Sequence, residues 1–225
     1  ISGDNIFAAG NGVFLSTNDG GDWSSSGLPV QSIYSLTISG NSVFAGTQYD
    51  GVFLSANNGG SWTNTNNGLT YHNIISLAAN GNNIFAGTEA GVFLSTSNGE
   101  SWNAAGLSGQ IINSLAASEN NLFAGTSGYS NDGVFISTNN GNNWTASNNG
   151  MSNPFIRCLI ANGNDIFAGT YLGGIFHSSN NGESWKAIGL LNNSVMCMSK
   201  IGNNIFTGTY MGGMFKSSDN GEYWS

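Results

Sequence analysis

Charged side chains are scarce in this sequence: they make up 7% of its 225 residues, and the formal net charge is -8. The four cations are Arg157, Lys186, Lys200 and Lys216. Proteins that bind nucleic acid need a basic surface that neutralises phosphates, so this composition argues against a nucleic-acid partner. The acidic balance also disfavours binding to an anionic membrane surface, and no run of eighteen apolar residues predicts a membrane span.

A helical pattern is missing as well, and a repeat stands in its place. No stretch keeps a 3.6-residue apolar period over eleven or more residues, so little or no helix is expected. Three patterns instead recur six times in the same order: a polar residue before a hydrophobic–Phe pair, a glycine before a second such pair, and a tryptophan. They begin at Asn5, Ser42, Asn83, Asn121, Asp165 and Asn204; at Gly12, Gly51, Gly91, Gly133, Gly174 and Gly213; and at Trp23, Trp62, Trp102, Trp144, Trp185 and Trp224. Successive tryptophans lie 39 to 42 residues apart, which is typical of a four-stranded propeller blade.

Each repeat divides into four short strands. In the third repeat the first three strands are expected at residues 74–78, 84–88 and 92–95, and the fourth around Trp102. β-branched and aromatic residues fill these stretches, whereas the Asn and Gly between them tolerate the positive φ that tight turns need. The sequence therefore predicts an all-β fold, a six-bladed β-propeller of four-stranded antiparallel blades in a single domain, 1–225. The blades are expected at approximately 1–31, 32–72, 73–110, 111–153, 154–192 and 193–225.

The innermost strand of the repeat occurs only five times, whereas the other three occur six times. Its copies are Ile33–Leu36, Ile74–Leu77, Ile112–Leu115, Ile156–Leu159 and Val195–Met198. The first blade is therefore expected to lack its innermost strand within this chain. An unpaired edge invites association, so we expect the strand to come either from residues outside this sequence or from another chain by strand addition.

The two cysteines, Cys158 and Cys197, share one slot of this innermost strand. Ser35, Ser76 and Ser114 fill the slot in the other copies, so we interpret it as a place for a small residue near the central channel. A disulfide is the alternative. The innermost strands of neighbouring blades are not hydrogen-bonded partners, however, and their Cα atoms can exceed the roughly 7 Å limit for a disulfide.

The turn before each tryptophan carries a polar motif. Residues 16–23 read STNDGGDW and residues 217–224 read SSDNGEYW. These turns resemble the Asp-box, S-x-D-x-G-x-[ST]-W, also called the BNR repeat of sialidase-like propellers, and the resemblance covers essentially the whole chain. The Asp position is occupied by Asn18, Asn57, Ser97, Asn139, Asn180 and Asp219. We expect each of these side chains to bond the backbone of its own turn and the tryptophan to pack beside it, which is a structural role. Five of the six lack the carboxylate that hard cations need, so no metal site is expected.

Catalytic chemistry finds little support in the sequence. The resemblance implies a sialidase with an arginine triad, but Arg157 is the only arginine. A glycosidase needs two facing carboxylates, and the acids expected near the channel mouth, Asp50, Glu89 and Asp132, come from separate blades without a recognisable motif. His72 and His177 lack metal-ligand spacing. We expect no enzyme activity, no metal and no cofactor. The alternative is a carbohydrate-active, glycoside hydrolase-like enzyme with a reduced active site.

Aromatic residues are expected on one face, in the loops around the channel mouth. These candidate ligand-binding residues are Tyr49, Tyr71, His72, Tyr129, Tyr171 and Tyr210. Exposed tyrosine suits stacking on sugars or anchoring a protein, although the rings could simply cover the loops of neighbouring blades. The abundance of Asn, Gly, Ser and Thr and the scarcity of lysine look like a secreted bacterial protein. We therefore expect a non-catalytic extracellular binding or structural module of a larger surface protein, assembly or filament, with a protein or glycan bound at this face.

Overall fold

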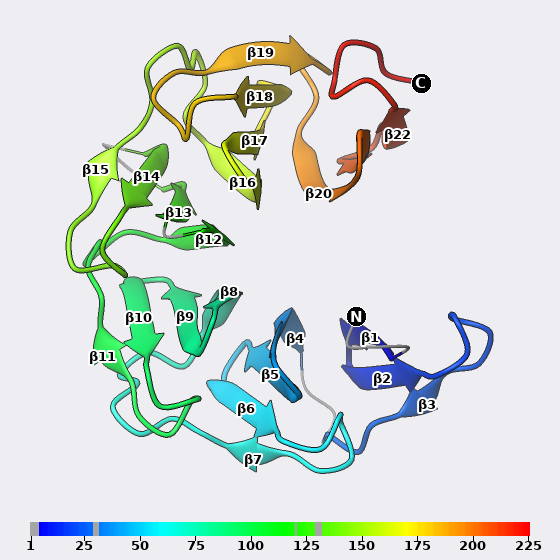
Figure 1. Ribbon diagram of the computed structural model, residues 1–225, viewed down its shortest axis with the longest axis vertical. Coiled ribbons are helices and arrows are strands. Elements are labelled where there is room, and N and C mark those ends of the chain that lie inside the picture. Colours follow the sequence, from blue (N-terminus) through cyan, green and yellow to red (C-terminus); the bar gives the residue numbers. More distant parts are fainter. Residues whose placement is uncertain (1–4, 29–31, 120, 129–131) are drawn as a thin grey trace. The chain divides into compact units, whose positions relative to one another are not determined.

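The computed structural model describes residues 5–28, 32–119, 121–128 and 132–225. Over these residues the chain forms β-strands and turns without a helix, and so no helix that could cross a membrane occurs in the described part. Twenty-two strands form six small antiparallel sheets, the blades of an all-β propeller (Figure 1). The chain divides into two units, Ile1–Gly109 and Gln110–Ser225, each with three of the sheets.

The first unit has one three-stranded and two four-stranded sheets. Its strands are β1 (Ile6–Gly10), β2 (Gly12–Ser16) and β3 (Ser24–Ser25); β4 (Ile33–Ser39), β5 (Ser42–Thr47), β6 (Val52–Ser55) and β7 (Thr63–Asn64); and β8 (Ile74–Asn80), β9 (Asn83–Thr88), β10 (Gly91–Ser95) and β11 (Asn103–Ala104). Strand β1 carries the same pattern as β5, the second strand of its sheet. The predicted absence of an innermost strand from the first blade is therefore confirmed over the described residues.

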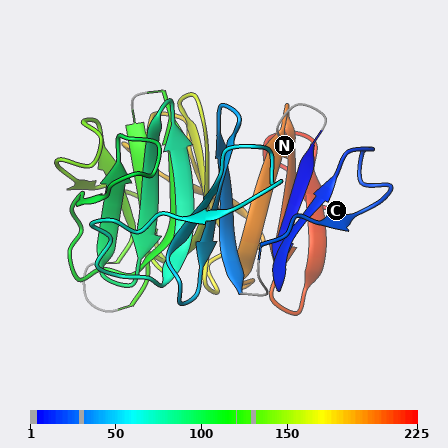
Figure 2. The same ribbon diagram turned by 90° about the horizontal axis from the view of Figure 1, so that it is seen from below.

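The second unit has two four-stranded sheets and one three-stranded sheet. Its strands are β12 (Ile112–Ser118), β13 (Asn121–Thr126), β14 (Val134–Ser137) and β15 (Thr145–Ala146); β16 (Ile156–Asn162), β17 (Asp165–Thr170), β18 (Ile175–Ser178) and β19 (Lys186–Gly189); and β20 (Val195–Ile201), β21 (Asn204–Thr209) and β22 (Gly213–Ser217). Within a sheet the strands run up and down in sequence order, joined by short turns (Figure 2).

The fourth strand differs from the expectation in two ways. It begins after the tryptophan instead of surrounding it, because Trp102 belongs to the turn and β11 starts at Asn103. The last sheet has no fourth strand, although Ser225 exchanges two backbone hydrogen bonds with Lys216, of 2.8 and 3.0 Å. This is the pairing that opens the fourth strand elsewhere, as between His177 and Lys186.

Neighbouring sheets pack closely because a glycine stands on the second strand. In the first unit, a Cβ atom on Gly46 would lie 2.5 Å from Ile74 Cγ2, and in the second, one on Gly125 would lie 2.4 Å from Ile156 Cγ2. The phenylalanines of the same strands, such as Phe123, are fully buried. Burial of one such side chain contributes about 1.5–3 kcal/mol. The buried clusters combine residues of neighbouring sheets, so the core of each unit lies between its sheets.

Each innermost strand contains a β-bulge at the same point. The register of β16 with β17 shifts between Ile156 and Cys158, which leaves Arg157 as the extra residue. Strands β4, β8, β12 and β20 shift at the equivalent position. Bulges often re-aim a side chain next to a functional site, so these positions bear on the binding surface described below.

Candidate functional site

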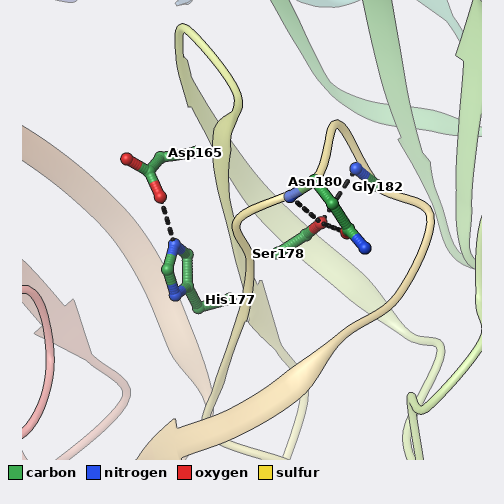
Figure 3. A network of polar contacts seen from close by, with 5 residues as sticks. All are labelled: Asp165, His177, Ser178, Asn180 and Gly182. Carbon is green, nitrogen blue, oxygen red and sulfur yellow. Dashed lines mark hydrogen bonds and ion pairs between the residues drawn. The ribbon is translucent and has the colours of Figure 1, made fainter.

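The polar turn motif is held by its own side chains. In the fifth repeat the Ser178 hydroxyl donates to Asn180 Oδ1 over 2.8 Å and accepts from the Gly182 N–H over 2.8 Å (Figure 3). Asn180 Oδ1 also accepts from the Ser184 N–H over 3.1 Å. Equivalent bonds recur at Asn57 and at Asp219. The short polar side chain thus closes the turn, as Asn, Ser and Asp can all do.

In both units, tryptophans that follow these turns reach the preceding sheet. Trp102 Nε1 donates to the Thr65 carbonyl over 2.8 Å in the first unit, and Trp185 Nε1 donates to the Ser147 carbonyl over 2.8 Å in the second. The sequence suggested packing beside the turn but not this link, because the partner carbonyl lies 37 or 38 residues earlier. The motif therefore fastens one blade to the next as well as closing its own turn.

Each carboxylate considered for catalysis has its own surroundings within its unit. In the first unit, Glu89 Oε2 accepts from Asn73 Nδ2 over 3.0 Å, and the backbone carbonyl of Asp50 accepts from two asparagine side chains. In the second unit, Asp132 is only 8% exposed, and its Oδ2 accepts from the Gly128 N–H over 2.9 Å. Asp132 Oδ1 has no hydrogen-bond partner among the described residues.

The two histidines have different surroundings. His72 Nε2 lies 3.1 Å from the Leu69 carbonyl in the first unit. In the second unit, His177 Nε2 lies 2.7 Å from Asp165 Oδ1 (Figure 3), and its ring stacks on Phe167 with centroids 4.4 Å apart. The described residues contain no group of three or more His, Cys, Asp or Glu side chains placed to hold a metal.

The pairing of His177 with Asp165 escaped the sequence analysis. The signal that could have found it is the cross-strand register, which places His177 opposite Phe167 where Leu94 stands opposite Phe85 in the third repeat. His177 also lines a groove of about 570 Å³ together with Lys186, Ile188, Asp219, Glu222 and Tyr223. The lining residues of this groove stand on β18, on β19 and in the turn after β22, and do not include Tyr171 or Tyr210.

The predicted aromatic loops are exposed in both units. In the first unit, Tyr49 is exposed, whereas Tyr71 lies at a centroid distance of 6.3 Å from Phe93 and so partly covers its own sheet. In the second unit, Tyr171 and Tyr210 are 45% and 61% exposed and make no hydrogen bond or ring contact with each other. Tyr129 lies outside the described residues.

A small cavity accompanies Tyr171. It has a volume of about 310 Å³ and is lined by Ser127, Gly128, Phe155, Arg157 and Tyr171. The guanidinium carbon of Arg157 lies 5.4 Å from the centroid of the Tyr171 ring, within the range of a cation–π interaction. Two exposed aromatic rings and the chain's only arginine therefore meet at one point of the predicted face.

The cysteines are both free thiols. Cys158 is partly buried, with Sγ 3.9 Å from the Val195 carbonyl, and Cys197 is exposed. Burial raises the pKa of the Cys158 thiol to about 12, and the nearby Cys197 acts in the same direction. Cys158 therefore stays protonated at neutral pH and is a poor nucleophile.

Comparisons with known proteins agree with the propeller fold. A family model described as the DUF6242 beta propeller domain matches residues 55–155. A search of curated proteins finds no match. The family match and the six sheets together define the chain as a β-propeller.

Solved structures resemble the chain at low sequence identity. The GH74 xyloglucanase from Xanthomonas campestris is 13% identical with a TM-score of 0.77, over 99% of this chain and 44% of that one. YCF48 from Cyanidioschyzon merolae is 14% identical with a TM-score of 0.76, over 100% of this chain and 81% of that one. The extracellular domain of BT4673 from B. thetaiotaomicron is 19% identical with a TM-score of 0.76, over 96% of this chain and 31% of that one.

These structures differ from the chain in length. It spans 31% of an ancestral GH74 enzyme that it also resembles at 20% identity, so it corresponds to a part of that protein. At such identities the likeness concerns the fold alone, and function has to be argued from the residues of this chain.

Proposed function

We propose that this propeller is a non-catalytic, extracellular binding module whose ligand, a protein or a glycan, contacts the tyrosine-bearing loops. The observation that carries the proposal is the exposure of Tyr171 beside Phe155 and Arg157 at a small cavity. Exposed aromatic rings beside a cation are typical of binding surfaces, since they offer a large contact area at a low cost in side-chain entropy.

The extracellular setting is supported by composition and by one group of relatives. Amides and hydroxyls, rather than lysines, make the surface polar, and BT4673 supplies an extracellular domain of similar fold. Another similar structure, YCF48 bound to D1 peptide, shows a propeller of similar fold in complex with a peptide.

Binding assays on substituted protein test the proposal. We expect Tyr171→Ala and Tyr210→Ala each to weaken binding to a panel of glycans and peptides by about 5- to 30-fold, as the loss of an aromatic anchor costs roughly 1–2 kcal/mol. Tyr223→Ala is the control, because Tyr223 is even more exposed than Tyr171 and Tyr210 but belongs to the last polar turn. An equal effect of all three substitutions, or a panel without any ligand, would count against the proposal.

A second candidate function is a glycoside hydrolase-like enzyme with a reduced active site, which the likeness to GH74 enzymes favours. Its test is the release of reducing sugar from xyloglucan by the wild-type protein and by the triple variant Asp50→Asn, Glu89→Gln, Asp132→Asn. Turnover that the triple variant abolishes supports the enzyme. Turnover that survives the substitutions, or none from the wild type, argues against it.

The open edge of β1 is a second place where we propose that a partner acts. Strand β1 pairs with β2 on one side and with no strand on the other among the described residues. An added strand could continue the sheet through backbone hydrogen bonds. Hydrogen exchange of the β1 amides tests this: slow exchange only in the assembled protein is expected, and equally fast exchange in the isolated chain and the assembly would contradict strand addition.

A further inference from the structure

The cavity beside Tyr171 is built around an arginine that a β-bulge presents. Arg157 is the extra residue of β16, and its side chain is exposed. The residues at the same point of the other innermost strands are uncharged: Tyr34, Ile75, Asn113 and Met196. Only the fifth repeat therefore uses this bulge to present a charge, and it places the chain's only arginine there.

Backbone bonds hold the aromatic wall of this cavity. The Tyr171 N–H donates to the Phe155 carbonyl over 2.9 Å, and Asn153 Nδ2 donates to the Tyr171 carbonyl over 2.7 Å. Asn153 Oδ1 in turn accepts from the Phe155 N–H over 3.0 Å. One asparagine thus fixes both ring-bearing loops, so the rings are positioned before a ligand arrives.

The part of the cavity formed by Ser127 is linked to β16, the strand that carries Arg157. Asn113 Nδ2 donates to the Ile156 carbonyl over 2.7 Å and also to Ser127 Oγ. The bond to Oγ leaves the Ser127 hydroxyl proton available for donation toward the cavity. The cavity therefore offers a guanidinium, a hydroxyl and two ring faces within about 310 Å³.

The guanidinium lacks a protein partner for its charge. Within the described part of the chain, Arg157 makes no hydrogen bond and no ion pair, and its guanidinium lies over the Tyr171 ring. Asp132 does not line the cavity, and its Oδ2 accepts from the N–H of Gly128, which does. A guanidinium carries five N–H donors in a fork that matches a carboxylate, so an anion is the ligand that this group would bind best.

We propose that the Arg157 cavity binds the C-terminal carboxylate of a peptide whose last side chain is apolar and packs against Phe155 and Tyr171. The inference rests on the proposed function and names its ligand class. Net charge favours this ligand over an acidic polysaccharide: a chain of net charge -8 repels a polyanion, whereas a peptide can present a single carboxylate.

The test uses calorimetric titration with acetyl-glycyl-leucyl-phenylalanine and its C-terminal amide. We expect the free acid to bind at least about tenfold more tightly than the amide, because the amide lacks the charge that pairs with a guanidinium. Arg157→Gln removes this preference, and Arg157→Lys retains part of it. Lys186→Gln, which changes a cation on the outer strand β19, leaves it unchanged. Thermal unfolding verifies that the variants fold.

Several results would overturn the inference. The inference is wrong if the acid and the amide bind the wild type equally well, or if the preference for the acid persists in Arg157→Gln. It is also wrong if the acid does not bind at millimolar concentration. An oligoglucuronate that binds through Arg157 while the peptide does not would assign the cavity to an acidic saccharide instead. If ligands of the wider panel of glycans and peptides still need Tyr171 and Tyr210 for binding, the proposed function stands although the carboxylate inference fails. The failure of the inference is therefore distinguishable from the failure of the proposed function.

Discussion

The close approach of neighbouring blades depends on the glycine of the second strand, and Gly125→Ala tests it. The added Cβ would lie 2.4 Å from Ile156 Cγ2 and 2.9 Å from Ile156 Cβ. Ordinary contact between carbon atoms is about 3.5–4.0 Å, so the two strands must separate by roughly 1 Å. The first repeat has Ala9 at this slot, and there the residue is exposed.

Two opposing effects set the size of the change. Overpacking of this kind destabilises the folded protein by about 1–3 kcal/mol. Replacing glycine also reduces the conformational entropy of the unfolded chain, which stabilises the folded protein by about 0.4–1 kcal/mol. We expect a net loss of about 1–2 kcal/mol in the free energy of unfolding, or a fall of roughly 2–8 °C in Tm for a chain of this size. Thermal unfolding followed by circular dichroism measures it.

A control and a double-mutant cycle make this test specific. Gly10→Ala should be nearly neutral, because a Cβ there meets no atom within 4 Å. Ile156→Ala alone is expected to cost about 2–5 kcal/mol, but the pair Gly125→Ala with Ile156→Ala should cost less than the sum, since the clash is gone. A Gly125→Ala variant as stable as the wild type would refute the reasoning.

Four further predictions concern the polar turns and the thiols. Ser178→Ala removes the acceptor of the Gly182 N–H and should lower the free energy of unfolding by about 1–3 kcal/mol in denaturant titrations, and an unchanged midpoint would show that the turn does not need the bond. At pH 8 a thiolate-specific reagent should label Cys197 far faster than Cys158, whose pKa of about 12 keeps it protonated; equal labelling rates by mass spectrometry would contradict this. The pKa of Cys158 is higher in the folded protein than in the unfolded chain. Its contribution to the free energy of unfolding is therefore complete below about pH 9 and falls as the pH rises toward 12. The fall is at most ~1.4 kcal/mol per pH unit, and smaller because the side chain is only partly buried. The Ser217 hydroxyl holds the pKa of Asp219 below its usual range. The contribution of the Asp219 carboxylate to stability is therefore present above its pKa in the unfolded chain, and it is lost as the pH falls through its pKa in the folded protein. Asp219→Asn should reduce the acid sensitivity of unfolding, and an identical acid transition in both proteins would argue against that role.

The fold could be predicted from the sequence because each blade repeats its own local signals. The glycine, the Phe pair and the tryptophan recur in order, and counting the strands was enough to find the incomplete first blade. The fourth strand was placed too early because Trp102 looks like a strand residue, whereas its Nε1 bonds the preceding sheet from within the turn.

The candidate site could be predicted only in part. The exposure of Tyr171 follows from its place in a loop, but the role of Arg157 depends on a bulge that only the register of β16 with β17 reveals. The pairing of Asp165 with His177 likewise depends on cross-strand neighbours 12 residues apart. Such contacts come from the alignment of strands, which residue spacing alone does not specify.

The most direct test of the proposed binding face is nuclear magnetic resonance of the protein during titration with the acetylated tripeptide acid. Our account predicts that the ring signals of Tyr171 and Phe155 and the Nε–H signal of Arg157 shift together as the peptide binds, while Tyr223 in the polar turn stays unchanged. Shifts centred on the groove around His177 and Tyr223, or no shifts at Tyr171, would contradict it.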